Sequence, residues 1–92
     1  MSIQDEIAYY AKQYGVDPGY ALAVASRESS FNPNAHASKT IYGLFQMSAA
    51  ERAKYGVPYT RDVQTQVAGF AAYTNDLRKE LAGRLGRDPS DK

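Results

Sequence analysis

One apolar seam constrains the fold of this chain more than any other feature. Its six positions alternate four and three residues apart in the C-terminal third: Val63, Val67, Phe70, Thr74, Leu77 and Leu81. Such spacing returns to the same face of an α-helix, so it predicts one long amphipathic helix, capped by Asp62. A seam of this kind normally packs into a core, and we expect all of it to be buried. No alternation typical of a β-strand stands out in the chain.

Capping signals divide the rest of the chain into shorter helices. Ser2 and Ser48 each stand three residues before an acidic side chain, which is the pattern of a capping box. Asp17 precedes Pro18, a pair that is typical of a helix start. The expected helices run from Ser2 to Gly15, from Asp17 to about Glu28 or Ser29, and from Ser48 to about Tyr55 and Gly56. The sequence therefore predicts an all-α fold, a small orthogonal helical bundle.

Composition excludes several kinds of site. The 92 residues contain no cysteine, so disulfides and thiolate metal ligands are ruled out. The single histidine, His36, cannot build a zinc site of several histidines, and we expect no metal and no cofactor. We expect His36 to be a solvated loop residue, and the alternative is that it lines a substrate groove.

Charge and hydropathy narrow the choice of partners. The net charge is +1 with acidic and basic residues interleaved, whereas nucleic-acid-binding proteins concentrate basic residues on one face. No apolar run approaches the length of a membrane span, and the N-terminus lacks the basic and apolar regions of a signal peptide. We therefore expect no nucleic-acid partner and no membrane span.

Tyrosine is the main aromatic residue, with eight copies against three of phenylalanine. Its ring can stack on a sugar while its hydroxyl forms hydrogen bonds, although tyrosine is also common at the edge of a core. Tyr42 is the tyrosine that we expect in a binding groove. Packing at helix interfaces is expected for the remaining N-terminal ones: Tyr9, Tyr10, Tyr14 and Tyr20.

The first candidate for catalysis is a carboxylic acid at the end of the second helix. Glu28 follows Ala21 and Ala25 at helical spacing, so it extends the inward-facing stripe of that helix. Partial burial and the negative end of the helix dipole would both favour the protonated form that a general acid needs. The alternative is a surface residue, or one half of a weak ion pair with Arg27.

Two short motifs follow this acid. The first is Glu28-Ser29-Ser30-Phe31-Asn32-Pro33, and a loop with Ala37 and Ser38 then leads to the second, Gly43-Leu44-Phe45-Gln46. Gly43 allows close approach of the backbone to a ligand, and the Gln46 amide can both donate and accept hydrogen bonds. With their separation, the two motifs resemble the lysozyme-like lytic transglycosylases, of which goose-type lysozymes are relatives.

The resemblance implies a lysozyme-like fold and cleavage of peptidoglycan. The bond cut would be the β-1,4 bond between N-acetylmuramic acid and N-acetylglucosamine, with a 1,6-anhydro product. Glu28 would be the catalytic acid and base. The substrate-binding residues would be Ser29, Ser38, Tyr42, Gly43 and Gln46, although Ser29 could instead orient Glu28.

Two other functions remain open. One is a hydrolytic muramidase of the same fold, for which Asp62 is a candidate base. The other is a non-catalytic wall-binding or structural module of a phage tail or ejection machine. The expected site of action is the periplasm or cell wall, with delivery in a phage virion, and the partners would be glycan strands and other virion or envelope-machine proteins.

A third motif of the family bears on the extent of the domain. It has the form Ala-Tyr-Asn-Ala-Gly, and nothing after Gln46 matches it well. The run Ala72-Tyr73-Thr74-Asn75 falls inside the expected long helix, so we interpret it as a helix face. Residues 1–92 are therefore predicted to form a single lysozyme-like domain that lacks its C-terminal part. The run Asp88-Pro89-Ser90-Asp91 is expected to start one more helix.

Overall fold

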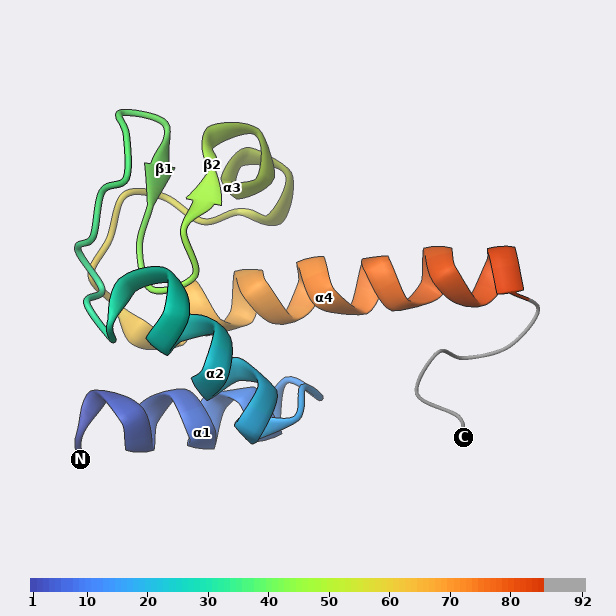
Figure 1. Cartoon of the computed structure of the whole chain (residues 1–92), viewed down its shortest axis with the longest axis horizontal. Coiled ribbons are helices and arrows are strands. Elements are labelled where there is room, and N and C mark those ends of the chain that lie inside the picture. Colours follow the sequence, from blue (N-terminus) through green and yellow to red (C-terminus); the bar gives the residue numbers. More distant parts are fainter. Residues whose placement is uncertain (86–92) are drawn as a thin grey trace.

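Four helices and a minor hairpin make up the part of the protein that the computed structural model describes, residues 1–85. In chain order they are α1 (Ile3–Gln13), α2 (Pro18–Ser29), β1 (Ile41–Tyr42), β2 (Met47–Ser48), α3 (Ala49–Tyr55) and α4 (Val63–Leu85). Figure 1 shows α1 running alongside and below the first half of α4, α2 lying obliquely across them, and the hairpin and α3 in a lobe above. The predicted small helical bundle is confirmed. The helix expected at residues 88–91 lies outside the described residues.

The helices begin at the residues that the capping signals predicted. Ser2 and Ser48 accept hydrogen bonds from the backbone N–H three residues on, at 3.0 and 3.1 Å, and both capping boxes are complete. The Asp17 carboxylate accepts a hydrogen bond from the Tyr20 N–H at 2.9 Å. Gly56, with φ of 71°, ends α3 in the left-handed conformation that glycine adopts at little cost. Local sequence therefore sets these boundaries.

The hairpin is a feature that the sequence did not predict. Ile41 pairs with Ser48 and Tyr42 with Met47 in antiparallel register. Each strand has only two residues, which is too short for an alternating pattern to be recognised. The turn between them depends on left-handed backbone at Gly43, with φ of 92°, and at Gln46, with φ of 49°.

The seam on α4 is buried over only its first half. Its first three apolar positions lie in the core: Val63, Val67 and Phe70. There Phe70 stacks on Phe45 of the hairpin turn, with ring centroids 4.0 Å apart. Leu77 and Leu81 are 40% and 43% exposed. The prediction that the whole seam is core is therefore wrong, because α1 and the hairpin turn reach only the middle of α4 (Figure 1).

The N-terminal tyrosines agree with expectation only in part. Tyr10 packs against the core as predicted, and Tyr20, although 50% exposed, stacks on Phe70 of α4 with ring centroids 6.0 Å apart. Tyr9 and Tyr14 are exposed. Helices α1 and α2 meet through smaller residues instead, including Ala11, Ala21 and Ala25, which are fully buried. Alanine lets two helices approach closely, so the larger rings remain at the surface.

Asp62 caps α4, and its charge is expected to make that cap depend on pH. Hydrogen bonds from the Thr65 hydroxyl (2.6 Å) and backbone N–H (2.9 Å) hold the pKa of Asp62 below its usual value of 3.8. A lowered carboxyl pKa stabilises the fold above the usual value, and this contribution is lost as the pH falls through the lowered pKa. We expect Asp62→Ala to reduce the free energy of unfolding by about 1 kcal/mol at neutral pH.

Urea unfolding followed by circular dichroism, repeated at several pH values, measures this difference. The gap between wild type and Asp62→Ala should shrink once the wild-type carboxylate is protonated, in the acid range below the usual aspartate pKa of 3.8. Asp62→Asn keeps a capping oxygen without the charge and serves as the control. A gap that stays constant throughout the acid range would contradict the role given to the charge.

Candidate active site

The chain turns sharply at the end of α2, two residues after Glu28. Ser30 and Phe31 both adopt left-handed backbone, with φ of 51° and 63°. The Ser30 N–H donates to the Ser26 carbonyl at 3.0 Å, and the Phe31 N–H reaches back to the Ala25 carbonyl at 3.4 Å. Such backbone costs on the order of 1–3 kcal/mol per residue and is concentrated at functional sites. The Phe31 side chain packs on the core and so holds the turn in place.

Glu28 lies in the last turn of α2, beyond the part of the helix that the core covers. Ala21 and Ala25, on the same side of the helix, are fully buried. The Glu28 side chain is nonetheless exposed, so its predicted partial burial is wrong. The inward-facing stripe of α2 extends to Glu28 in the sequence, but within residues 1–85 no element packs over that end of the helix. The carboxylate is therefore open to a ligand from solvent.

The Gln46 side chain clamps the loop of residues 30–40 to the hairpin turn. Its Nε2 donates to the Ala35 carbonyl at 3.0 Å and to the Gly43 carbonyl at 2.7 Å. Its Oε1 accepts from the Ala37 N–H at 2.9 Å. The Gly43 N–H donates to the Ala35 carbonyl, also at 2.9 Å. Both amide hydrogens of Gln46 are thus engaged, and one lone pair of its Oε1 remains for a ligand.

A second glutamine, which the sequence analysis missed, also holds the loop and the hairpin turn in place. Gln66 of α4 is 3% exposed, and its Oε1 accepts a hydrogen bond from the Leu44 N–H at 2.7 Å. Its Nε2 donates to the carbonyls of Pro33 and Thr60, at 2.9 and 2.7 Å. A signal was present in the sequence, since Gln66 follows Val63 by three residues and so faces the core. Buried amides are nearly always fully bonded, which makes such a position informative.

Arg52 of α3 is the third side chain that holds this region, and it was also missed. It is buried and donates to the carbonyls of Met47 and Thr40, at 3.3 and 3.2 Å. Its guanidinium carbon lies 4.3 Å from the ring centroid of Tyr59 and 5.9 Å from that of Tyr42. One arginine in a short charged helix gives no sequence signal of burial, because such residues usually face water.

Comparison with known protein families adds an independent finding. Residues 5–85 match the transglycosylase SLT domain. The chain belongs to this family. The SLT domain has a lysozyme-like fold, and its members are peptidoglycan lytic transglycosylases. No solved structure matches the chain.

Three further residues of this SLT domain were expected at the substrate. The Ser29 hydroxyl donates to the Ala25 carbonyl at 3.0 Å, which is a helix-end bond. Ser38 is exposed and lies 3.2 Å from the Thr40 hydroxyl. Tyr42 is buried, and its hydroxyl donates to the Asn34 side chain at 3.0 Å. The expected place of Tyr42 in an open groove is therefore corrected, since its ring lies beneath the loop that it supports.

The structure groups the expected site residues on two neighbouring segments. Ser38, Gly43 and Gln46 lie in the clamped loop and turn, whereas Glu28 and Ser29 lie at the end of α2. Figure 1 shows this end of α2 beside the hairpin turn, and the side chains of Phe31, Leu44 and Phe45 belong to one core cluster.

Among residues 1–85 no cluster of histidine, aspartate and glutamate could hold a metal ion. None of the described helices is both long and apolar enough to cross a membrane.

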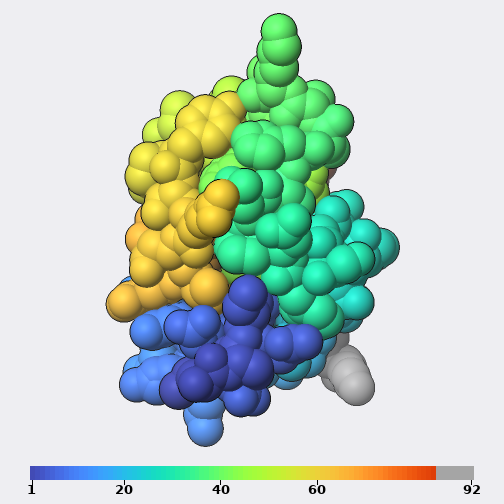
Figure 2. Space-filling view, turned by 90° about the vertical axis from the view of Figure 1, so that its left-hand side faces the viewer, coloured from blue at the N-terminus to red at the C-terminus, as the bar shows by residue number. Residues whose placement is uncertain are grey.

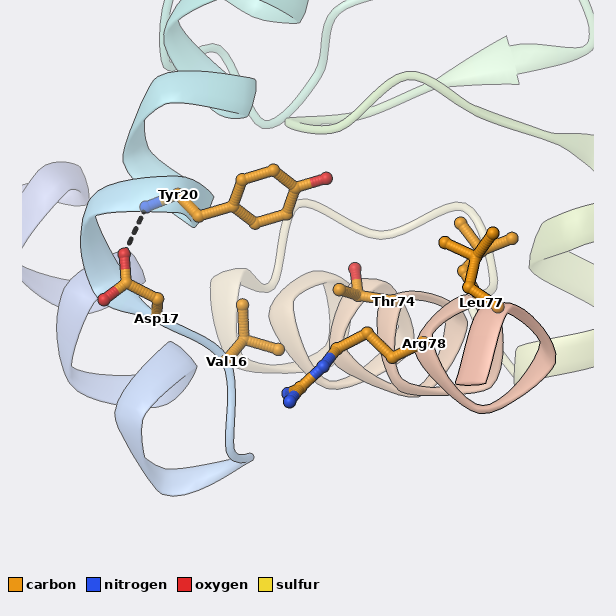
Figure 3. Close-up of a pocket in the computed structure, with 7 residues that line it drawn as sticks. Val16, Asp17, Tyr20, Thr74, Leu77 and Arg78 are labelled. Atoms are coloured by element: carbon orange, nitrogen blue, oxygen red, sulfur yellow. Dashed lines mark hydrogen bonds between the residues drawn. The ribbon is translucent and has the colours of Figure 1, made fainter. Parts of the chain in front are cut away.

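An open, mainly apolar groove lies along α4 of the SLT domain. Its volume is about 550 Å³, and its lining residues are Val16, Asp17, Tyr20, Thr74, Leu77, Arg78 and Leu81. Figure 3 shows Tyr20 reaching from α2 over the α4 helix that carries Thr74 and Leu77. Tyr73 is half-buried nearby on α4, and its burial, the charge of Glu51 and a hydrogen bond to Glu51 raise the pKa of Tyr73. The groove lining itself is suited to packing more than to chemistry, because Asp17 is already engaged as the cap of α2.

Proposed function

We propose that this SLT domain is a lytic transglycosylase in which Glu28 is the single catalytic acid and base. The bond cut is the β-1,4 bond between N-acetylmuramic acid and N-acetylglucosamine in peptidoglycan. The proposal is carried by the family match over residues 5–85, together with the position of Glu28. That carboxylate is open to solvent and lies two residues before the left-handed turn that begins at Ser30.

In the proposed reaction, protonated Glu28 donates its proton to the glycosidic oxygen as the bond to the anomeric carbon breaks. The sugar then has oxocarbenium character, which its own acetamido group can stabilise in place of a second carboxylate. The Glu28 carboxylate next removes the proton from the 6-hydroxyl of muramic acid. That oxygen bonds to the anomeric carbon and closes the 1,6-anhydro ring.

Because Glu28 is exposed in the free chain, the bound substrate itself would complete the surroundings of the carboxylate. A glycan lying over the end of α2 would exclude water from the carboxylate and supply the apolar surroundings that the free chain lacks. Ser38 and the free lone pair of Gln46 Oε1 are the proposed contacts for sugar hydroxyl and acetamido groups. Gly43 is buried with its N–H and carbonyl already bonded, so its part is to shape the turn that presents Gln46. Ser29 and Tyr42 support these contacts by holding the helix end and the loop.

The products of cleavage test the proposal. We expect the purified chain to release muropeptides that end in 1,6-anhydro-muramic acid from isolated cell-wall sacculi. Mass spectrometry identifies them, because each is lighter by one water than the corresponding hydrolysis product. Reducing ends would instead indicate the hydrolytic muramidase. The engagement of Asp62 by Thr65 at the start of α4 weighs against Asp62 as the base for such a hydrolysis.

One observation favours a second candidate, a non-catalytic wall-binding module. Glu28 is exposed, and within the described part of the chain no element packs over it to enclose a bound sugar. A module of this kind would sediment with sacculi and release no soluble muropeptides. The same incubation therefore separates the two candidates, provided that both the pellet and the supernatant are analysed.

A further inference from the structure

Two exposed aromatic rings lie together on the lobe that carries the hairpin. His36 and Tyr59 come from different loops, yet their ring centroids are 6.2 Å apart and their planes differ by only 24°. Both side chains are exposed, Tyr59 to 58%. Figure 2 shows the two segments, coloured green and yellow, side by side on one face of the molecule. Exposed rings with a shared orientation are suited to binding a flat ligand.

The Tyr59 ring is fixed in place by two other groups. Its hydroxyl donates to the Lys39 carbonyl at 2.6 Å, and the buried Arg52 guanidinium lies 4.3 Å from its centroid. The position of Arg52 is itself set by hydrogen bonds to two backbone carbonyls. The ring is therefore held before any ligand arrives, which lowers the entropy lost on binding.

The His36 ring is held through the backbone on both sides of it. The carbonyl of Ala35 and the N–H of Ala37 are both bonded to the Gln46 amide. The ring then rests on Tyr42, with centroids 4.7 Å apart. No polar partner is needed to explain its orientation, so its exposed surface is available to a ligand.

We propose that His36 and Tyr59 form a stacking platform for a β-1,4-linked chain of N-acetylated amino sugars. The C–H face of a pyranose ring is flat and apolar, and it packs on aromatic rings while its hydroxyls remain in water. Two ring centres 6.2 Å apart lie within the length of one disaccharide. The exposed Thr40 hydroxyl stands on the same loop and can bond a sugar hydroxyl. The choice of glycan rests on the proposed function.

The platform is distinct from the proposed reaction site. In Figure 2 the green loop stands between the yellow segment that contains residue 59 and the teal end of α2 that contains residue 28. A glycan on the platform would therefore be held at a place where no bond is cut. Its role would be to anchor the domain on an insoluble substrate.

The single histidine of the chain gives a direct test. In untagged protein, the imidazole carbon-bound protons produce proton NMR signals that belong to His36 alone. The Glu28→Gln variant, titrated with chitotetraose, separates binding from cleavage. We expect the His36 signals to shift with saturating ligand concentration.

Variants then measure the contribution of the platform to affinity. His36→Ala removes an exposed ring and should raise the dissociation constant about two- to tenfold, while His36→Tyr should restore binding. Tyr59→Ala should act in the same direction. Tyr9→Ala, which removes an exposed tyrosine from α1, is the matched control and should bind as the parent does.

The outcomes separate this inference from the proposed function. Chitotetraose that leaves the His36 signals unmoved, or binds His36→Ala as tightly as Tyr9→Ala, overturns the platform even if sacculi are cleaved. Shifted His36 signals with weaker binding by His36→Ala support the platform even if no muropeptide is released. His36→Ala keeps the test decisive if Tyr59→Ala does not fold, because the His36 ring lies at the surface.

Discussion

Glu28→Gln is expected to slow the release of muropeptides from sacculi by roughly 10²- to 10⁴-fold. Glutamine has the shape of glutamic acid but can neither donate a proton to the glycosidic oxygen nor remove one from the 6-hydroxyl. The side chain is exposed, so the substitution should leave the unfolding temperature unchanged. Initial rates of muropeptide release, measured by chromatography at equal protein concentrations, give the comparison.

A matched substitution on α4 controls for the loss of a surface carboxylate. Glu80 is exposed and bonds Arg84 one turn along the helix, so Glu80→Gln removes only a weak surface pair. Its rate should equal that of wild type. If Glu28→Gln also cleaved at the wild-type rate, Glu28 could not be the proton donor. If neither the wild-type chain nor Glu28→Gln released muropeptides, the non-catalytic wall-binding module would be favoured.

Gln66→Leu is expected to reduce the free energy of unfolding by roughly 3–5 kcal/mol. Leucine fits the volume but forms none of the three hydrogen bonds of the amide, so a buried Leu44 N–H and the carbonyls of Pro33 and Thr60 lose their partner. A domain of this size is expected to have only about 5–14 kcal/mol in total. Urea unfolding followed by circular dichroism measures the loss.

Gln64 provides the control for this substitution on the same helix. Its amide donates to the Tyr14 hydroxyl at the surface, at 3.1 Å, and Gln64→Leu should change stability by no more than about 0.5 kcal/mol. Equal effects of the two substitutions would show that the buried amide does not hold the loop. A loss of stability confined to Gln66→Leu would support the role of the buried Gln66 amide in holding the loop.

The helices were predictable because their signals are local. A capping box joins residues three apart, so Ser2 and Ser48 identify their helix starts without knowledge of the rest of the chain. The two motifs around Glu28 and Gln46 were recognised for the same reason. Short-range patterns thus gave the helix boundaries, the fold class and the family.

The remaining features depend on contacts between distant segments. Gln66 bonds Leu44 and Pro33, which are 22 and 33 residues away in sequence. The burial of Glu28 and of Leu77 was misjudged because an amphipathic pattern shows which face could be covered, not whether another element reaches it. Gln46 was expected to offer its amide to a ligand, and only the coordinates reveal how much of it the loop already uses.

The half-covered seam on α4 has a consequence for how the molecule opens. Up to Ala71 the helix packs on α1 and the hairpin turn, so we expect its amide protons to exchange with solvent most slowly. Past Leu77 the same helix is held mostly by its own hydrogen bonds, and it can fray without disturbing the rest. The part of the protein that we expect to unfold as one cooperative unit therefore ends within α4, although the helix itself is continuous.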